Sequence, residues 1–271
     1  LSGKYITAED VGMETADMDT VREVTPYVTG ISEDKGGSGN PSPITAYGVF
    51  MGMKAAAKFK YGSDNLQGKT VLVQGIGHVG ESLVDHLTKE GANVLISDIN
   101  QERLQEVSKL YNAGIYEGED VYSADVDIYA PCALGATIND STIDRFKASI
   151  IAGAANNQLA DDRKHGIILR EKGILYAPDF LINAGGIINV YAELEGYGKK
   201  EIMEKTENIY NTTLEILSSA DANDISTHEA ALKIAQQRIA DRKNLFRLTQ
   251  QCGCREISSF RSDDQKSKYP L

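Results

Sequence analysis

The sequence is poor in the residues that build metal sites and disulfide frameworks. It has three cysteines and four histidines among 271 residues. Cys132 stands alone and Cys252 and Cys254 lie near the C-terminus, which is neither an even-numbered disulfide framework nor the paired spacing of a zinc site. The histidines form no short-spaced pattern either; they are His78, His86, His165 and His228. We therefore expect no metal site, and we assign Cys252 and Cys254 no function.

Long hydrophobic runs are also missing. No segment approaches the roughly 20 consecutive apolar residues that cross a bilayer, and the N-terminus has no basic start followed by an apolar stretch. Positive charge is scarce, because 28 lysines and arginines face 39 aspartates and glutamates, for a net charge of -11. Such a field repels phosphate backbones. We expect a cytoplasmic protein that binds neither membranes nor nucleic acid.

The rest of the composition, with 41% hydrophobic and 25% charged residues, is typical of a globular chain that buries one or two cores. The first residue is Leu1, and a structured-looking stretch follows at once. Two interpretations are open at this point. Either the natural protein begins earlier, or the boundary arises from expression or processing.

Helix and strand patterns alternate through the middle of the chain. Residues 42–60 have apolar side chains at helical spacing, with Ser42 suited to cap the helix and Pro43 to its first position. β-rich runs follow at residues 70–74 and 93–97, with a helical pattern between them. Further helices are expected after Asn100 and after Asn139, and further strands within residues 127–131, 149–153 and 174–178. This alternation predicts an α/β fold of the Rossmann type, a doubly wound and mostly parallel sheet covered by helices on both faces.

The strand signal ends after Gly186. Two long helical patterns follow, one around residues 202–217 and one over residues 227–243. From Asn244 onward the chain loses periodicity and becomes polar, as a frayed tail does. We expect C-terminal helices over residues 191–243 and a polar tail over residues 244–271.

The strongest local signal is the run Gly75-Ile76-Gly77-His78-Val79-Gly80, which lies between a predicted strand and a predicted helix. Gly75 permits a tight turn, Gly77 lets the backbone approach a pyrophosphate, and Gly80 allows the helix to pack closely on the strand. The phosphates would lie at the helix N-terminus, where unpaired N–H groups favour negative charge. His78 is either a donor to the pyrophosphate or a solvent-facing residue.

Asp98 supplies the second half of this signal. It follows Gly80 at about the 20-residue spacing of the dinucleotide fingerprint, at the end of the next predicted strand. A carboxylate there accepts hydrogen bonds from the ribose hydroxyls and repels a 2'-phosphate, so the sequence predicts NAD as the cofactor. The alternative is a glycine-rich turn in some other α/β protein, with Asp98 on its surface.

Five further stretches have no explanation in the fold alone. They are TAEDVG at residues 7–12, GNPSPITAYGV at 39–49, APCALGATIN at 130–139, GAANNQ at 153–158 and PDFLINAGGIINV at 178–190. In this order around the glycine loop, the chain resembles the glutamate, leucine, phenylalanine and valine dehydrogenase family, and within it the leucine dehydrogenases. The resemblance implies NAD-dependent oxidative deamination of a branched-chain L-amino acid (leucine, valine or isoleucine) to the 2-oxo acid and ammonia.

The resemblance also implies roles for single residues. Asp10 matches the family's catalytic aspartate, which carries protons to and from the amine and the attacking water; without the other motifs it would be taken for a capping or surface carboxylate. Thr45 and Asn156 match residues at the nicotinamide. Cys132 and Ala133 match positions that line the cofactor's ribose region, so Cys132 is expected to be a packed residue and not a nucleophile.

Four residues are candidates for the substrate. Asn157 and Asn183 either donate hydrogen bonds to the substrate or hold the local turn together. Ile187 and Val190 match two positions whose size and polarity differ among family members, and both are aliphatic here. Such a pocket accepts a branched apolar side chain and rejects a glutamate carboxylate, which would be buried without a partner. Both residues could equally be ordinary core residues, and the two interpretations are not exclusive.

The resemblance divides the chain into a remnant of an N-terminal catalytic and substrate domain over residues 1–41, an NAD-binding Rossmann domain over residues 42–190, and the helices and tail given above. It implies a catalytic lysine and a second lysine for the substrate carboxylate, both upstream of Leu1, because Lys4 and Lys35 stand in other contexts. We therefore expect this chain to bind NAD better than it turns over substrate, and the complete enzyme to be a homo-oligomer. The alternatives are an NAD-binding module without catalysis, or a phenylalanine- or glutamate-type dehydrogenase.

Overall fold

A six-stranded sheet forms the centre of the molecule in a computed structural model that describes residues 3–10 and 12–251, with side chains up to residue 243. The strand order is β3-β2-β1-β4-β5-β6, and every neighbouring pair is parallel. The strands are β1 (Thr70–Gln74), β2 (Asn93–Ser97), β3 (Gly114–Ile115), β4 (Ile128–Pro131), β5 (Ile150–Ile151) and β6 (Leu175–Tyr176). This is the doubly wound order, so the predicted fold class is confirmed.

Successive side chains of β1 point to opposite faces of the sheet. Val71 and Val73 lie in one core cluster, whereas Leu72 between them lies in a second cluster with Tyr129 and Phe146. Because both faces are buried, the strand reads as a continuous apolar run in the sequence. Complete burial of each such aliphatic side chain stabilises the fold by about 1.5–3 kcal/mol.

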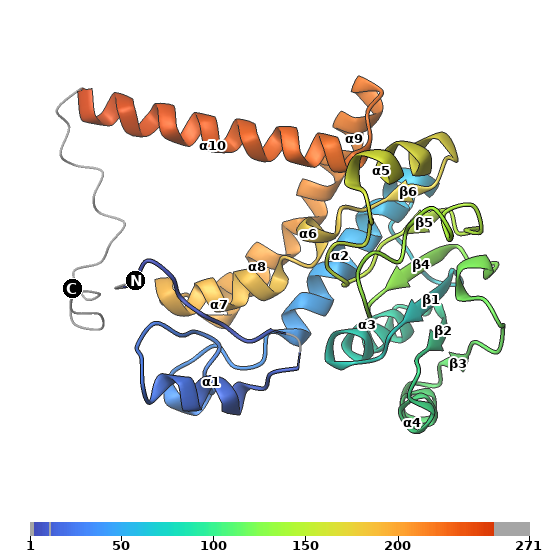
Figure 1. The fold of residues 1–271 in the computed structure, drawn as a ribbon, viewed down its shortest axis with the longest axis horizontal. Helices are drawn as coiled ribbons and strands as arrows, with labels where there is room; N and C mark the ends of the chain where they lie inside the picture. Colours follow the sequence, from blue (N-terminus) through green and yellow to red (C-terminus); the bar gives the residue numbers. More distant parts are fainter. Residues whose placement is uncertain (1–2, 11, 252–271) are drawn as a thin grey trace.

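Helices cover both faces of the sheet (Figure 1). α2 (Ser42–Tyr61), α3 (His78–Lys89) and α4 (Gln101–Tyr111) contribute to the first cluster. The second face is covered by α5 (Asp162–Glu171), by the turn η2 (Val121–Ser123) and by the loop before β5. The later helices are α6 (Asp179–Ile182), α7 (Gly185–Glu195), α8 (Lys199–Glu207), α9 (Ile209–Asn223) and α10 (Thr227–Gln251).

α2 is the helix that connects the parts of the molecule, since it contacts α3, α6, α7, α8 and α9. The N–H of Ser42, its first residue, donates to the Asn40 Oδ1 at 2.8 Å, and Pro43 holds the second position and not the first. The expectation that Ser42 is the cap is therefore wrong, because Pro41 holds the cap position and Ser42 is already helical. Further along, a Cβ on Gly52 would collide with the Ile182 side chain, so α2 and α6 are in close contact.

The helix expected after Asn139 is absent, and residues 139–146 form a series of turns instead. The polar side chains at its start explain the difference. The Asn139 Oδ1 accepts hydrogen bonds from both the N–H and the hydroxyl of Ser141, and the Thr142 hydroxyl donates to the Thr137 carbonyl oxygen. Asparagine, serine and threonine compete with helical backbone bonding in this way.

The two C-terminal helical patterns also end differently from their prediction. The pattern around residues 202–217 is two helices, α8 and α9, separated at Asn208, whose side chain accepts a hydrogen bond from the Asn211 amide at 3.1 Å. α10 continues past Lys243 to Gln251, because residues 244–251 contain neither glycine nor proline and several good helix formers. The remainder of the predicted polar tail, with Cys252 and Cys254, lies outside the described residues.

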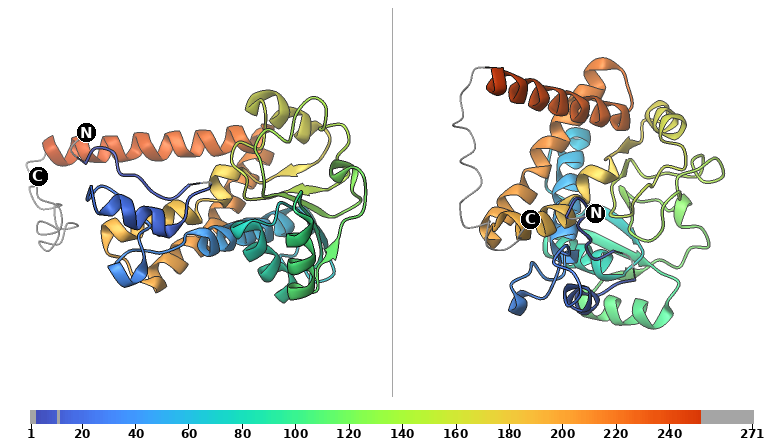
Figure 2. Two further views of the ribbon diagram at one scale, coloured as in Figure 1. Left: turned by 60° about the horizontal axis from the view of Figure 1, so that its bottom comes forward. Right: turned by 60° about the vertical axis from the view of Figure 1, so that its left-hand side comes forward.

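The segment before α2 forms a small layer of its own. It contains α1 (Thr15–Arg22) and the turn η1 (Glu33–Lys35), and Thr7 pairs with Val28 in a parallel bridge. Met18, Val28 and Ile31 form its small core. This segment and the long helix α10 both extend away from the sheet on the same side of the molecule (Figures 1 and 2).

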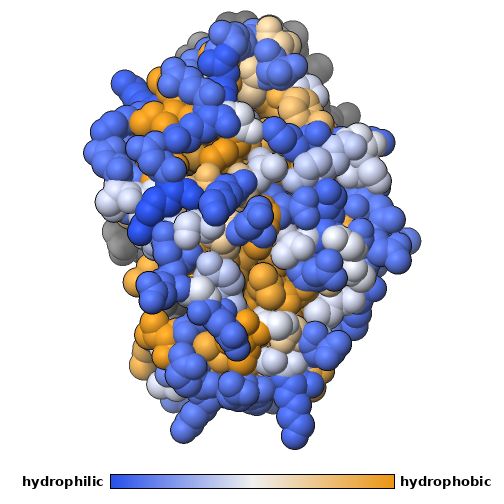
Figure 3. Space-filling view, turned by 90° about the vertical axis from the view of Figure 1, so that its right-hand side faces the viewer, coloured by the Kyte–Doolittle hydropathy of each residue, from blue (hydrophilic) through white to orange (hydrophobic). Residues whose placement is uncertain are grey.

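The opposite end of the molecule carries the sheet. Hydrophilic residues cover most of the face shown in Figure 3, and hydrophobic residues are visible in separate areas between them. That surface agrees with a chain in which charged residues make up 25% of the sequence.

Candidate active site

The glycine loop joins β1 to α3 at the carboxyl edge of the sheet. Gly75 has a φ of 94°, in the left-handed region, and a Cβ there would lie 2.7 Å from the Ala133 Cβ. A Cβ on Gly80 would collide with the Gly75 carbonyl oxygen, so the first turn of α3 packs directly on the loop. A Cβ on Gly77 would meet nothing within 4 Å. The loop therefore leaves open space beside the N-terminus of α3, where an anion is favoured.

Asp98 follows β2 and is held beside this loop. Its Oδ2 accepts a hydrogen bond from the Ile76 N–H at 2.9 Å, and its Oδ1 accepts one from the Asn100 N–H at 2.9 Å. Each carboxylate oxygen has two lone pairs, so both retain acceptor capacity toward the pocket that Asp98 lines. The orientation of the carboxylate is thus set by the backbone before any ligand binds.

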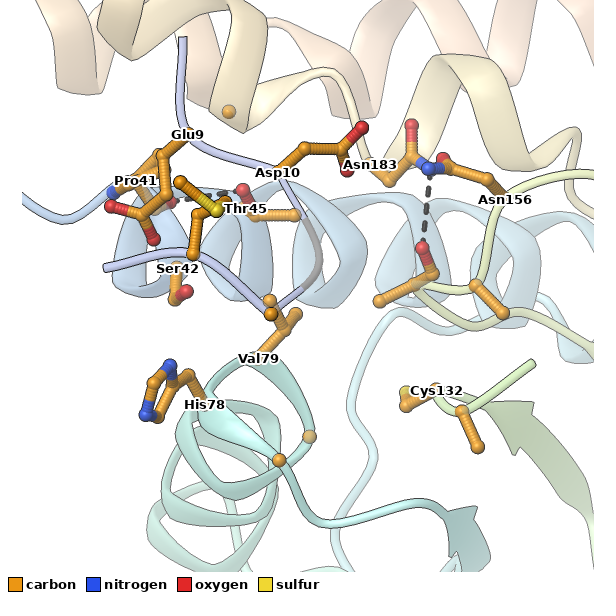
Figure 4. A pocket seen from close by; sticks show the side chains of 18 of the residues that line it. Glu9, Asp10, Pro41, Ser42, Thr45, His78, Val79, Cys132, Asn156 and Asn183 are labelled. Atoms are coloured by element: carbon orange, nitrogen blue, oxygen red, sulfur yellow. Dashed lines mark hydrogen bonds between the residues drawn. The ribbon is translucent and has the colours of Figure 1, made fainter. Parts of the chain in front are cut away.

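The pocket at this edge has a volume of about 1010 Å³ and lies at the switch point between β1 and β4. In Figure 4, Glu9 and Asp10 lie across the pocket from His78. The structure brings most of the predicted site residues together as lining residues: Asp10, Thr45, Gly77, His78, Val79, Gly80, Asp98, Cys132, Ala133, Asn156, Asn183, Ile187 and Val190.

Two predicted residues do not line the pocket. Gly75, at the start of the loop, is packed against Ala133 and is not a lining residue. Asn157 has a φ of 53°, and its carbonyl oxygen accepts a hydrogen bond from the Ala136 N–H at 2.7 Å. Asn157 was expected either to bind the substrate or to hold the local turn together, and its position favours the second role.

Amide and hydroxyl groups gather at the end of the pocket formed by α2 and α7. The Asn183 Nδ2 donates to the Asn156 Oδ1 at 2.6 Å (Figure 4) and to the Ala154 carbonyl oxygen at 3.1 Å. The Thr45 hydroxyl donates to the Pro41 carbonyl oxygen at 2.9 Å, which leaves its lone pairs as acceptors. A Cβ on Gly186 would lie only 2.8 Å from the Thr45 Oγ1, so the start of α7 lies directly beside Thr45.

Two consecutive carboxylates line the same wall. Glu9 accepts a hydrogen bond from the Thr15 hydroxyl at 3.2 Å, whereas the Asp10 side chain extends toward Asn183 in Figure 4. Burial raises the pKa of Glu9, and the Thr15 hydroxyl offsets part of that effect. Sequence reasoning missed Glu9, although its place next to Asp10 in the TAEDVG stretch was a signal.

The two aliphatic residues of α7 differ in accessibility. Val190 is 8% exposed, and Ile187, one turn earlier, is 66% exposed, while both line the pocket. A Cβ on Gly30 would lie 3.8 Å from the Val190 Cγ1, so the segment before α2 closes over Val190. Val190 is therefore the enclosed apolar contact, and Ile187 lies at the open mouth.

Glu193, on α7, binds the segment before α2. This role was not predicted from the sequence. Its Oε2 accepts hydrogen bonds from the Gly30 N–H at 2.8 Å, from the Ser38 N–H at 2.9 Å and from the Ser38 hydroxyl at 3.1 Å. The available signal was its spacing, because a residue three after Val190 lies on the same face of a helix.

Cys132 follows β4 and is partly exposed to the pocket. Burial raises the pKa of its thiol to about 12, against a smaller lowering by a hydrogen bond from the Ala154 backbone. A protonated thiol is a poor nucleophile, which agrees with a packing role.

Within residues 3–10 and 12–251, no cluster of three or more histidine, cysteine, aspartate or glutamate side chains is suited to a metal ion. No lysine is among the described residues that line the pocket. No helix in the described part of the chain is both long and apolar enough to span a membrane.

The fold and the pocket define an α/β protein with a Rossmann-like sheet and a glycine loop at its switch point. Comparison with known sequences narrows this class, because the family model for Glutamate/Leucine/Phenylalanine/Valine dehydrogenase matches residues 36–101 and 95–245. The chain belongs to this family.

Individual relatives agree with the family model. The chain is 52% identical over 244 residues to a leucine dehydrogenase of Bacillus cereus, covering 90% of this chain and 66% of the relative. It is 53% identical over 239 residues to a leucine dehydrogenase of Bacillus subtilis, covering 88% and 65%. The solved structure of L-tryptophan dehydrogenase from Nostoc punctiforme is 42% identical, with a TM-score of 0.78, covering 89% of this chain and 69% of that one. The chain thus spans about two thirds of the length of its curated leucine dehydrogenase relatives.

Proposed function

We propose that this chain belongs to an enzyme that catalyses the NAD-dependent oxidative deamination of a branched-chain L-amino acid. The observation that carries the proposal is a single pocket with two unlike ends. One end has the glycine loop and Asp98, and the other has Asp10 and the enclosed Val190. Residues 42–190 are the proposed NAD-binding domain, and the segment before them is part of the substrate side.

The glycine loop and Asp98 suit NAD as the dinucleotide. The open space at Gly77 gives a pyrophosphate access to the N-terminus of α3, and the fixed Asp98 oxygens suit two ribose hydroxyls. Thr45 and Asn156 would orient the nicotinamide carboxamide, since one offers lone pairs and the other an amide. When bound, NAD supplies the acceptor for the hydride that leaves the α-carbon.

The protein's own groups would move the protons. Asp10 extends into the pocket on the wall opposite the glycine loop, where a carboxylate can take a proton from the substrate amine and then from the water that attacks the imine carbon (Figure 4). Asn183 lies toward Asp10 in the same view and is a candidate donor to the substrate. Asn157, outside the pocket lining, is retained in the proposal only as a residue of the local turn.

Substrate choice would depend on α7. Val190 is nearly buried and aliphatic, so it favours a branched apolar side chain and leaves a substrate carboxylate without a partner. The family resemblance further suggests a homo-oligomer, which sedimentation of the purified protein would test.

The cofactor assignment is tested by titrating the chain with NADH and with NADPH, following nicotinamide fluorescence. We expect NADH to bind at least about tenfold more tightly, because Asp98 repels a 2'-phosphate. Asp98→Ala should narrow the preference, whereas Asp125→Ala, an exposed aspartate outside the pocket lining, should leave it unchanged. Equal or tighter binding of NADPH by the unaltered chain contradicts the proposal.

One observation favours a second candidate, binding of NAD by this chain without turnover. No lysine is among the described lining residues, and the family resemblance implies lysines at the substrate. Leucine-dependent formation of NADH, followed by absorbance, distinguishes the two, because only the enzyme produces a signal that depends on the amino acid.

A further inference from the structure

Arg103 is a pocket residue that the function above does not use. It lies in the first turn of α4, one turn beyond Asp98, and it lines the same pocket. Its backbone N–H donates to the Asn100 Oδ1 at 3.0 Å, and the Asn100 N–H donates in turn to Asp98. The arginine is therefore built into the wall that receives the adenosine ribose in the proposed function.

Two carboxylates occupy its guanidinium. Nη1 donates to the Glu106 Oε2 at 2.7 Å, and Nη2 donates to the Glu81 Oε2. Glu81 belongs to the first turn of α3, so the guanidinium joins the starts of α3 and α4. Tyr111 supports the arrangement, since its hydroxyl lies 3.4 Å from the Glu81 Oε1 as a donor. We call Glu81, Arg103 and Glu106 the arginine clamp.

The charges of the clamp decide what this end of the pocket can bind. Glu81 and Glu106 hold one guanidinium, and Asp98 lines the same pocket, so these four groups together carry a net negative charge. A ribose 2'-phosphate would meet that excess negative charge and would compete with two carboxylates for the guanidinium. Guanidinium is nevertheless the side chain whose planar donors best match phosphate oxygens.

We propose that the arginine clamp is a second determinant of cofactor choice beside Asp98, and that Arg103 is a latent ligand for a ribose 2'-phosphate. The inference rests on the proposed function, because it assumes that the dinucleotide's adenosine end lies beside Asp98. Substitution of Asp98 alone should therefore not create an NADP site, because Glu81 and Glu106 still hold the arginine.

The two ion pairs of the clamp differ in exposure, and the more exposed pair is the better one to disrupt by mutation. The Glu106 side chain is 63% exposed, whereas those of Arg103 and Glu81 are 29% and 22% exposed. An exposed ion pair within one helix contributes little to stability. Glu106→Gln therefore removes the charge that holds one edge of the guanidinium and leaves only a weaker neutral acceptor there, while Glu81 still holds the other edge.

The experiment compares full-length variants that share Asp98→Ser. NADPH and NADH are titrated by fluorescence, and 2',5'-ADP is titrated as a competitor of NADH. We expect Asp98→Ser/Glu106→Gln to bind NADPH and 2',5'-ADP about tenfold more tightly than Asp98→Ser, the scale of one charge-assisted hydrogen bond. NADH affinity should differ by no more than about threefold between these two variants. NADH has a 2'-hydroxyl in place of the 2'-phosphate, so it offers no charged group for the released arginine.

Two further variants separate the arginine from a general change of charge. Asp98→Ser/Glu102→Gln removes the same charge from an exposed position of the same helix turn, and it should leave NADPH affinity at the Asp98→Ser level. Adding Arg103→Met to Asp98→Ser/Glu106→Gln should abolish the gain. The inference is overturned if Glu106→Gln brings no gain, if Glu102→Gln brings the same gain, or if the gain survives Arg103→Met. Failure of the unaltered chain to bind NADH overturns the proposed function and this inference together.

Discussion

Glu9 and Asp10 are neighbours in the chain and carry the same chemical group, yet their surroundings differ. Glu9 is tied to Thr15 and its pKa is raised by burial, whereas Asp10 extends across the pocket (Figure 4). A proton carrier must reach the substrate, so the proposed function gives that role to Asp10. Glu9 also lines the pocket.

In a preparation that oxidises leucine, Asp10→Asn should therefore remove turnover and keep cofactor binding. The substitution preserves shape and removes the base, and a positioned proton carrier typically contributes about 10²- to 10⁴-fold. The measurement is steady-state oxidation of L-leucine together with NADH titration of the same preparation. Glu23→Gln, an exposed residue of the same segment, is the matched control and should change neither value. If turnover survives in Asp10→Asn, or if NADH binding and thermal stability collapse with it, Asp10 is a structural residue.

Val190 and Ile187 give a paired test of substrate contact. Val190→Ser should reduce kcat/KM for leucine relative to a polar amino acid by about 1–3 kcal/mol in transition-state stabilisation, as expected for an enclosed apolar contact. Ile187→Ser should shift the same ratio less, because that side chain is mostly exposed. Equal shifts, or no shift for Val190→Ser, would show that Val190 does not face the substrate side chain.

At the scale of elements, α7 combines three tasks in a helix of eleven residues. Its start lies against Thr45, its middle presents Val190, and its last turn carries Glu193. Because one helix carries all three, a displacement of α7 would affect both the proposed substrate end of the pocket and the docking of the segment before α2.

Glu193→Ala should loosen that docking. The N–H groups of Gly30 and Ser38 lose their shared acceptor, which for partly buried donors costs about 1–3 kcal/mol. Urea unfolding measures the loss, and limited proteolysis should cut more rapidly within residues 28–40. Glu195→Ala on the same helix removes only an exposed bond to the Tyr191 hydroxyl, so its effect should stay below about 0.5 kcal/mol. Similar losses for both variants would rule out a special role for Glu193.

His86 makes the contact between α3 and α2 sensitive to pH. Its ring stacks on Phe50, with centroids 5.4 Å apart, and lies 5.5 Å from the Tyr47 ring. Burial lowers the pKa of His86 below its ordinary value of 6.5, Asp85 acts in the opposite direction, and Lys89 adds to the lowering. Since the folded pKa lies below the unfolded one, the stabilisation is complete above about pH 6.5 and is lost as the pH falls toward the folded pKa.

His86→Phe should weaken that dependence while it keeps the aromatic contact. The free energy of unfolding, measured in urea at pH 8 and at pH 5, should fall less between the two values in the variant than in the unaltered protein. An unaltered pH difference in His86→Phe would place the responsible group elsewhere.

For the whole molecule, sequence patterns predicted those elements that depend on interactions between residues close together in the chain. The strands at residues 70–74 and 93–97, the helix after Asn100 and the turn of the glycine loop between β1 and α3 have clear signals within short stretches of sequence, and the structure confirms these predictions. The turns at residues 139–146 were missed because apolar spacing does not show how asparagine and threonine side chains bond to the backbone. The break at Asn208 was missed for the same reason.

In the candidate site, too, the residues within sequence motifs could be predicted, and the contacts between distant segments could not. Motifs identified most of the residues that line the pocket, because those motifs belong to continuous stretches. The Glu193 contacts to Gly30 and Ser38 join residues far apart in the sequence, and the arginine clamp joins two different helices. Such contacts depend on the folded arrangement, so neither periodicity nor composition could reveal them.

The distribution of the pocket along the chain also sets the order in which it can be assembled during synthesis. The glycine loop and Asp98 belong to one β1-α3-β2 unit, and their hydrogen bond joins residues within it. Asp10 and Val190 are far apart in the sequence and can line the same pocket only after α7 has left the ribosome. Contacts of long sequence separation form late because the intervening chain must be ordered first. Under the proposed function, the nucleotide end can thus be ordered on a nascent chain that has passed β4 but still lacks α7, and a dinucleotide would stabilise that part of the pocket first.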